Sequence, residues 1–173
     1  MACGYSWILG GRIMKWILLL LIPFSIYSQE LVPAPNFGTD VYGYLFLRDA
    51  TFVLSTTNAN FVTVDSLDMG DSYGCTLSDS SITVHKTGVY LIAFNSSFSG
   101  AATVTIDGNI FINTTSVSGF DRKMGATGDV GAASCSYIGT LTSGDIIKAK
   151  FTNKSTDAAI TINNINLKVM RIK

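Results

Sequence analysis

The chain has 173 residues and carries 12 basic and 12 acidic side chains, so its formal net charge is zero. This length allows one domain with a sizeable core and is too short for two ordinary domains joined by linkers. A chain without excess positive charge lacks the electrostatic footprint of nucleic-acid binding, so we expect no nucleic-acid partner.

Residues 1–28 have the pattern of a secretory signal peptide. Positive charge at Arg12 and Lys15 precedes an apolar run from Trp16 to Phe24, and small residues follow. The alternative is a membrane anchor, but the run is only about a dozen residues long, well short of the ~20 that span a bilayer. We therefore expect cleavage, a protein that is secreted or lies at the cell surface, and no membrane insertion once the leader is removed.

Residues 29–40 contain two prolines in a polar setting, which predicts a short extended lead-in. Residues 41–173 then predict strands throughout, as short runs rich in β-branched and aromatic residues bounded by Asn, Asp, Ser and Gly. Asp107-Gly108, between two β-branched runs, is a strong hairpin signal. The expected strands cover residues 42–47, 60–66, 81–85, 88–99, 102–113, 131–141, 146–153 and 159–172.

Outside the leader no window carries apolar residues at helical spacing, so we expect an all-β chain. About eight to ten antiparallel strands separated by turn signals predict a β-sandwich, a jelly roll of about ten strands. In the last strand, Ile160 and Ile162 share one face, whereas Ile165 and the apolar residues after it share the opposite face. A bulge at Asn163-Asn164 is therefore expected, because it returns the apolar side chains to one side.

Two of these strands are apolar on both faces. In 88–99 the opposing sets are Tyr90, Ile92 and Phe94 against Val89, Leu91 and Ala93. In 42–47 they are Tyr42, Tyr44 and Phe46 against Leu45 and Leu47. An antiparallel strand with one face in water should alternate apolar with polar residues, and soluble monomers rarely expose large apolar patches. We expect one face of each strand to pack in the core and the other against further copies of the chain, and the sequence leaves open which is which.

Three short motifs occur in a defined order along the chain. Gly88 to Tyr90, in "TGVYLIAF", is a Gly-x-Tyr at the start of a strand; Leu141 to Asp145, in "LTSGDIIKAKFTN", is a Leu-x-x-Gly-Asp turn; and a final strand ends "LKVMRI". In these motifs the chain resembles the jelly-roll domain shared by tumour necrosis factor and the globular head of complement subcomponent q. The resemblance covers Tyr42 to Ile172 and implies a ten-stranded sandwich, a tight homotrimer and no enzymatic activity.

The segment "FDRKMGATGDVGA" resembles part of the stand-alone microbial versions of this domain, which occur in exported bacterial proteins and on phage. The resemblance favours a secreted structural or adhesive module whose partner is an extracellular protein or glycan. A monomeric carbohydrate-binding module and a phage fibre or virion decoration head are the alternatives among binding proteins. A small secreted hydrolase is the alternative enzyme, disfavoured because the chain has one histidine and no paired carboxylates on one strand face.

Removal of the leader leaves Cys75 and Cys135, which permit one disulfide in an exported protein. Buried free thiols are the alternative. Neither cysteine has a CxxC partner, so we expect no zinc-type metal site. His85, the single histidine, is expected at the outward end of its strand, where nothing indicates the buried carboxylate and nucleophile of a catalytic triad. We expect no catalytic residue and no cofactor.

The segment Asp65 to Tyr73 is expected to be a surface loop. It contains three aspartates at intervals of three, Asp65, Asp68 and Asp71. Oxygen-rich loops of this kind can bind calcium, although the EF-hand spacing is absent. The alternative is a solvated loop in which aspartate simply favours turns.

The segment Phe120 to Asp129 is expected to be a second loop, in which Phe120, Arg122 and Lys123 lie near flexible glycines. Loops on a rigid fold are where binding residues usually lie, and Tyr and Arg often anchor interfaces. We expect this loop and the one ending at Tyr73 to form the contact region for a partner. The alternative is that both loops are simply solvated.

Overall fold

The structure, a computed structural model, describes residues 41–48, 51–54, 60–126, 128–154 and 158–173. The expected signal peptide and lead-in lie outside the described residues, so both stay predictions.

The described residues form twelve β-strands and no helix, as the lack of helical periodicity predicted. Consequently, none of them belongs to a helix able to cross a membrane. The strands are β1 (Tyr42–Leu47), β2 (Phe52–Leu54), β3 (Val62–Thr63), β4 (Asp68–Tyr73), β5 (Cys75–Ser78), β6 (Ser81–Val84), β7 (Gly88–Gly100), β8 (Thr105–Ile112), β9 (Thr115–Lys123), β10 (Asp129–Leu141), β11 (Ile146–Asn153) and β12 (Ile160–Arg171).

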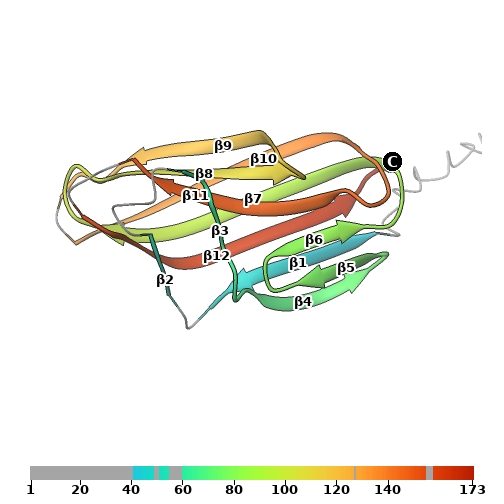
Figure 1. The fold of residues 1–173 in the computed structure, drawn as a ribbon, viewed down its shortest axis with the longest axis horizontal. Coiled ribbons are helices and arrows are strands. Elements are labelled where there is room, and N and C mark those ends of the chain that lie inside the picture. The colour runs from blue at the N-terminus through green and yellow to red at the C-terminus, as the bar shows by residue number, and fades with distance from the viewer. Residues whose placement is uncertain (1–40, 49–50, 55–59, 127, 155–157) are drawn as a thin grey trace, which may run out of the picture. The chain divides into compact units, whose positions relative to one another are not determined.

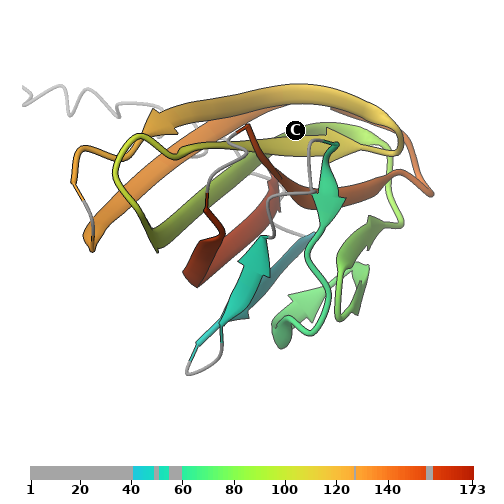
Figure 2. The ribbon, with the colours of Figure 1, turned by 60° about the vertical axis from the view of Figure 1, so that its left-hand side comes forward.

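The strands pair antiparallel into two sheets that face each other (Figures 1 and 2). Sheet 1 has the order β10-β7-β12-β1-β4, with β2 beside β12. Sheet 2 has the order β5-β6-β11-β8-β9, with β3 beside β11. Many neighbours are far apart in the chain, as where β1 pairs with β12. Two antiparallel sheets joined in this long-range order form a jelly roll, so the predicted fold class is confirmed.

The core lies between the two sheets and settles which face of β7 is buried. Tyr90, Ile92 and Phe94 are fully buried there, whereas the alternate residues of β7, such as Leu91, lie on the outer face of sheet 1. The ring of Phe94 stacks on that of Phe120 from sheet 2, with centroids 5.6 Å apart. Aromatic pairs of this kind stabilise a core beyond their buried area.

On β1 the aromatic residues take the other side. Leu45 is fully buried and Leu47 nearly so, which leaves Tyr42, Tyr44 and Phe46 on the outer face of sheet 1. The six residues predicted for a core or trimer face therefore divide into two sets. The three of β7 belong to the core, and the three of β1 to the outer face.

The predicted bulge in β12 is confirmed. The pairing of β12 with β7 shifts register between Ile162 and Asn164. As a result Ile160, Ile162 and Ile165 are all fully buried, although their spacing in a regular strand would put the last on the opposite face.

The hairpin predicted at Asp107-Gly108 was wrong. Strand β8 runs straight through these residues, and the chain reverses after it at Asn113, whose φ is +56°. Gly108 is needed for a different reason than a turn. It pairs with Phe120 of β9, and a Cβ at position 108 would lie 2.4 Å from the Phe120 ring.

The first predicted loop is largely a strand, whereas the second is a strand only at its two ends, so the first prediction was wrong and the second was right only in part. Asp68–Tyr73 is β4 at the edge of sheet 1, and Phe120–Lys123 is the end of β9 at the edge of sheet 2. An edge strand borders solvent along one side, so it carries charged residues that make its sequence look like a loop. Of the residues predicted in the first loop, only Asp65 to Leu67 lie outside a strand.

Candidate functional site

A row of apolar side chains crosses the outer face of sheet 1 from one edge to the other. In the pairing register, Leu91 of β7 lies between Ile138 of β10 and Met170 of β12. Met170 is followed by Tyr42 of β1 and then by Tyr73 of β4. Directly paired residues on neighbouring strands present their side chains on the same face. We call these five residues the apolar row.

The apolar row is largely exposed. The exposed fraction is 64% for Ile138, 60% for Tyr73, 42% for Tyr42 and 38% for Met170. The rings of Tyr42 and Tyr73 stack with centroids 6.5 Å apart, so the row ends in an aromatic surface. Contiguous exposed apolar side chains mark interaction sites, whereas isolated ones are common on any protein surface.

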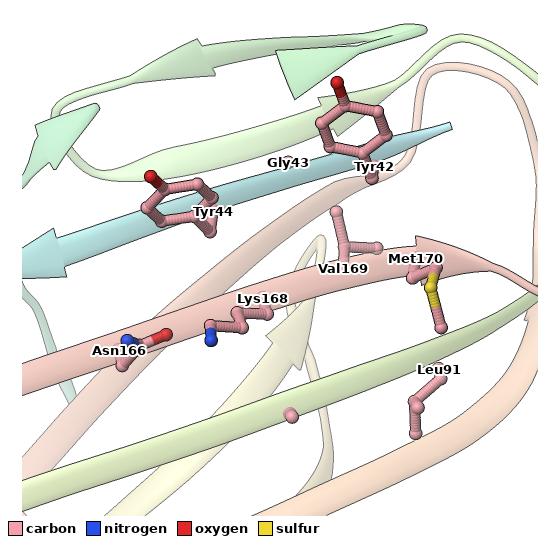
Figure 3. Close-up of a pocket in the computed structure, with 9 residues that line it drawn as sticks. Tyr42, Gly43, Tyr44, Leu91, Asn166, Lys168, Val169 and Met170 are labelled. Atoms are coloured by element: carbon pink, nitrogen blue, oxygen red, sulfur yellow. The ribbon is translucent and has the colours of Figure 1, made fainter. Parts of the chain in front are cut away.

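Beyond the apolar row, the outer face becomes more polar along the strands. The next row consists of Ser136, Ala93, Lys168 and Tyr44. The row after it consists of Ser134, Asn95, Asn166, Phe46 and Asp68. A cavity of about 560 Å³ extends from the apolar row to Asn166, and its lining includes Tyr42, Leu91 and Lys168 (Figure 3).

A second cavity, of about 280 Å³, lies toward the end of β1, where it is lined by Phe46, Arg48 and Asn164 among others. Tyr44 and Asn166 line both cavities, so the two adjoin along β1 and β12. The Tyr44 and Phe46 rings stack with centroids 5.8 Å apart. The guanidinium carbon of Arg48 lies 5.6 Å from the centroid of the Phe46 ring. We call this second cavity with its adjoining floor the β1 groove.

Strand β10 forms a long uncharged edge of sheet 1. No strand pairs with its outer side in the part of the chain that the structure describes. From Val130 to Leu141 its sequence contains neither a charged residue nor a proline. Proteins usually protect such an edge with charge, proline or a covering segment. The edge is therefore a second feature that is suited to contact with another chain.

The aspartates of the predicted calcium loop do not come together. Asp68 and Asp71 lie on β4 with exposed side chains, and Asp65 precedes the strand. Among the described residues, no three His, Cys, Asp or Glu side chains are placed to hold a metal ion. Tyr73, from the same segment, belongs to the apolar row instead.

The residues of the second predicted loop lie in different surroundings. Phe120 packs between Phe94 and Phe98 in the core, with ring centroids 5.6 and 6.1 Å away, so it is not free to contact a partner. Arg122 lies 4.0 Å from Asp129 at the edge of sheet 2, and Lys123 is exposed at the end of β9. This edge is opposite the β4 edge, so the two segments lie apart within one subunit, and their predicted role as a contact region stays a prediction.

The two cysteines are free and lie at opposite edges of the sandwich. The thiol of Cys75 on β5 donates to the backbone carbonyl of Tyr42 at 3.0 Å, whereas Cys135 lies on β10. Burial raises the pKa of both thiols, which keeps them protonated and unreactive near neutral pH. The disulfide that the sequence permitted is not formed, and the alternative of free thiols holds.

His85 contacts a hydroxyl but no acid. Its Nε2 lies 2.7 Å from Oγ1 of Thr76, and both side chains are at the surface. No carboxylate contacts the ring among the described residues. A triad requires an acid that orients the imidazole beside the nucleophile, so this pair does not form one.

Sequence reasoning missed Ile138, Met170 and Arg48. The first two are single apolar positions in otherwise small or polar outward sets, and only the strand register joins them to Leu91. Met170 follows the buried Val169, and two consecutive apolar residues in a strand point to opposite faces, so this pair could have indicated that the end of β12 is apolar on both faces. For Arg48 the sequence carries no signal beyond its position directly after an aromatic strand.

Fold and site together define a two-sheet jelly roll with an apolar row across the outer face of sheet 1. No family model matches the chain, and no curated protein matches it in sequence. Among solved structures, Eiger TNF from S. frugiperda is similar with a TM-score of 0.58 and 10% identity, over 77% of this chain and 92% of that one. Murine APRIL has a TM-score of 0.55 and 15% identity, over 75% and 98% of the two chains.

The PRD1 vertex protein P5 is similar to the same degree, with a TM-score of 0.56 and 17% identity, over 79% of this chain and 99% of that one. At these identities the likeness concerns the fold alone. It confirms the tumour necrosis factor-like jelly roll that the three sequence motifs predicted.

Proposed function

We propose that the protein is a non-enzymatic jelly-roll module that assembles as a homotrimer through the outer face of sheet 1. In this proposal it serves outside the cell as a structural or adhesive interaction module. The apolar row carries this proposal. It crosses the whole width of the sheet, and four of its members have more than a third of their surface in water. Covering apolar surface contributes roughly 25 cal/mol per Å², so a second copy over the row is favourable.

A ring explains both unusual features of the surface. The apolar row and the uncharged β10 edge are different patches of one subunit. Contact between two different patches is heterologous, and it closes into a ring when the rotation between subunits fits. The resemblance to tumour necrosis factor implies that this ring has three members.

The extracellular role rests on the leader and on the lack of catalytic groups. The first 28 residues have the pattern of a signal peptide, which directs export. The paired sheets leave no helix dipole, metal cluster or His–carboxylate pair among the described residues that would support catalysis. An exported protein without such groups is best suited to binding, and its partner would be an extracellular protein or glycan.

A second candidate is a phage fibre or virion decoration head. The likeness to the PRD1 vertex protein P5 supports it, because the alignment covers 99% of that chain and therefore the whole of its fold. Both candidates share the trimeric jelly roll and differ in where it is attached.

Size-exclusion chromatography with light scattering tests the assembly. The mature chain from Gln29 is expected to run as a trimer at micromolar concentration, since obligate interfaces usually bury ~2,000 Å² or more. Ile138→Asp should convert it to a folded monomer, because the substitution puts a charge in the apolar row.

Met69→Asp is the matched control. Met69 is 59% exposed, close to the 64% of Ile138, and it also lies on an edge strand of sheet 1. It pairs with the core residue Leu45, however, and so points away from the outer face. This variant should stay trimeric. A wild-type chain that is a soluble, folded monomer would overturn the proposal.

A further inference from the structure

Tyr44 and Phe46 form an aromatic platform on the floor of the β1 groove. Their rings are within 28° of parallel, with centroids 5.8 Å apart. Gly70 of β4 makes room for the platform, because a Cβ there would lie 2.1 Å from the Tyr44 ring. The platform is on an interior strand, since β1 pairs with β12 on one side and β4 on the other.

Two cations and an amide border this platform. The guanidinium of Arg48 lies over the Phe46 ring. Lys168 is paired with Tyr44, and Asn166 with Phe46, so both follow the platform along β12 (Figure 3). The Oδ1 atom of Asn166 is buried and has no hydrogen-bond partner among the described residues. Neither cation forms an ion pair with any of the described residues.

The acid nearest in register lies outside the lining of the groove. Asp68 pairs with Phe46 from the β4 side, but it lines neither of the two adjoining cavities. Within the part of the chain that the structure describes, the groove therefore offers two positive charges without an ion-pair partner, an apolar aromatic floor and a buried acceptor that lacks a donor.

We propose that the β1 groove binds carboxylated saccharides, such as uronic or sialic acid residues. This inference rests on the proposed function, because it names the ligand of the interaction module. The C–H face of a sugar ring would stack on Tyr44 and Phe46, and a sugar hydroxyl would donate to Oδ1 of Asn166. The carboxylate would bind Arg48 by charge-assisted hydrogen bonds, which are the stronger and more selective kind, and Lys168 would bind a further acidic or hydroxyl group of the sugar.

A saccharide fits this groove better than an acidic peptide does. An extended peptide usually binds by adding a strand to a free sheet edge through backbone hydrogen bonds. The backbone of β1 is already paired on both sides, so only side chains are available for recognition. Flat aromatic rings bordered by amides and cations suit a ring-shaped, hydroxylated and negatively charged ligand.

Assembly on the apolar row leaves the Arg48 end of the groove accessible. Tyr42, in the row, and Arg48, at the far end of the groove, are six residues apart, or roughly 20 Å along an extended strand. A trimer that closes at the Tyr42 end of β1 can therefore present the Arg48 end to solvent, once in each subunit.

Isothermal titration of the mature chain at low salt tests the inference. The probes are trigalacturonate and sialyllactose, with methyl-esterified trigalacturonate as the neutral counterpart and tetraglutamate as the acidic peptide. At least one of the two acidic sugars should bind, and for trigalacturonate the ester should bind about tenfold more weakly, because it cannot form the charge-assisted bond. Arg48→Gln and Lys168→Gln should each weaken binding of the acidic sugar about tenfold on the same grounds.

Lys123→Gln is the matched control, since it removes an exposed positive charge at the end of β9, away from the groove. Binding by this variant should equal that of the wild type. Failure of both acidic sugars to bind, equal binding by the Arg48 and Lys123 variants, or equal affinity for tetraglutamate would each overturn the inference. Light scattering on the same samples separates the two proposals: a trimer that binds no sugar contradicts only the groove, and a monomer with Arg48-dependent binding contradicts only the assembly.

Discussion

The aromatic centre of the core depends on one glycine. The ring of Phe120 lies over Gly108 and is surrounded by Phe94, Phe98 and Phe151, with centroids between 5.6 and 6.2 Å away. Gly108→Ala would place a methyl group 2.4 Å from this ring. We expect the substitution to lower the free energy of unfolding by about 1–3 kcal/mol, the usual cost of overpacking. Urea unfolding followed by fluorescence or circular dichroism measures it.

Gly125→Ala is the comparison for this prediction. A Cβ at position 125 would meet its nearest neighbour, Oδ2 of Asp129, at 3.7 Å, which is ordinary van der Waals contact. This variant should therefore unfold at nearly the wild-type urea concentration. Equal stability of the two alanine variants would mean that the Phe120 ring moves aside without cost.

At the scale of the element, the turn between β8 and β9 is fixed to the turn that precedes β11. Asn113 has a φ of +56°. Its Oδ1 accepts from the backbone N–H of Ile146 at 3.0 Å, and its Nδ2 donates to Oδ1 of Asp145 at 2.9 Å. The other oxygen of Asp145 accepts from the backbone of Thr142. The Leu-x-x-Gly-Asp motif thus supports two turns through one carboxylate.

Two substitutions at Asn113 separate its backbone role from its side-chain role. Asn113→Gly loses both side-chain hydrogen bonds but tolerates the positive φ, whereas Asn113→Ala loses the bonds and also adopts an unfavourable conformation. Both should be less stable than the wild type, with the alanine variant lower than the glycine variant by about 1 kcal/mol. Thermal or urea unfolding gives the order. An alanine variant as stable as the glycine variant would refute the conformational part.

The sequence predicted the interior strands better than the edges, for a physical reason. Strands such as β7 and β12 are bordered by other strands on both sides, and their runs of apolar, β-branched and aromatic residues are easily recognised as strands. The edge strands β4, β5 and β9 border solvent, so charge, serine and glycine are tolerated and no such apolar run appears. These three strands were missing from the prediction, and so was the three-residue strand β2.

The candidate site could be predicted only in part. Apolar residues on both faces of 42–47 and 88–99 indicated that an outer face of the sheet is covered. The register between β1, β12, β7 and β10 decides which residues meet on that face. It joins segments that are far apart in the chain, and Leu91 and Met170, for example, are more than 70 residues apart. Register of this kind is set by tertiary packing, so the row containing Ile138 and Met170 was not visible in any single segment.

At the scale of the whole molecule, adjacent residues of β7 have opposite tasks. Tyr90 is fully buried, and its hydroxyl donates to the backbone carbonyl of Lys86 at 2.6 Å. Leu91 lies on the outer face, between Ile138 and Met170 of the apolar row. A charge placed at Tyr90 should therefore disrupt folding, whereas the same charge placed at Leu91 should disrupt assembly.

Tyr90→Asp should unfold the subunit, because it buries a charge and removes a large core side chain, changes that together cost several kcal/mol. Leu91→Asp should give a folded monomer with the circular dichroism spectrum of the wild type.

Ligand or subunit binding to the native state raises its stability by mass action. The melting temperature of the wild type should therefore rise with protein concentration, and that of the Leu91 variant should not. Light scattering and melting curves measure both effects. The protein concentration should vary a hundredfold, because each tenfold step shifts an association equilibrium by about 1.4 kcal/mol. A Leu91 variant that stays trimeric, or a wild type whose melting temperature is independent of concentration, would place the subunit interface elsewhere than on the apolar row.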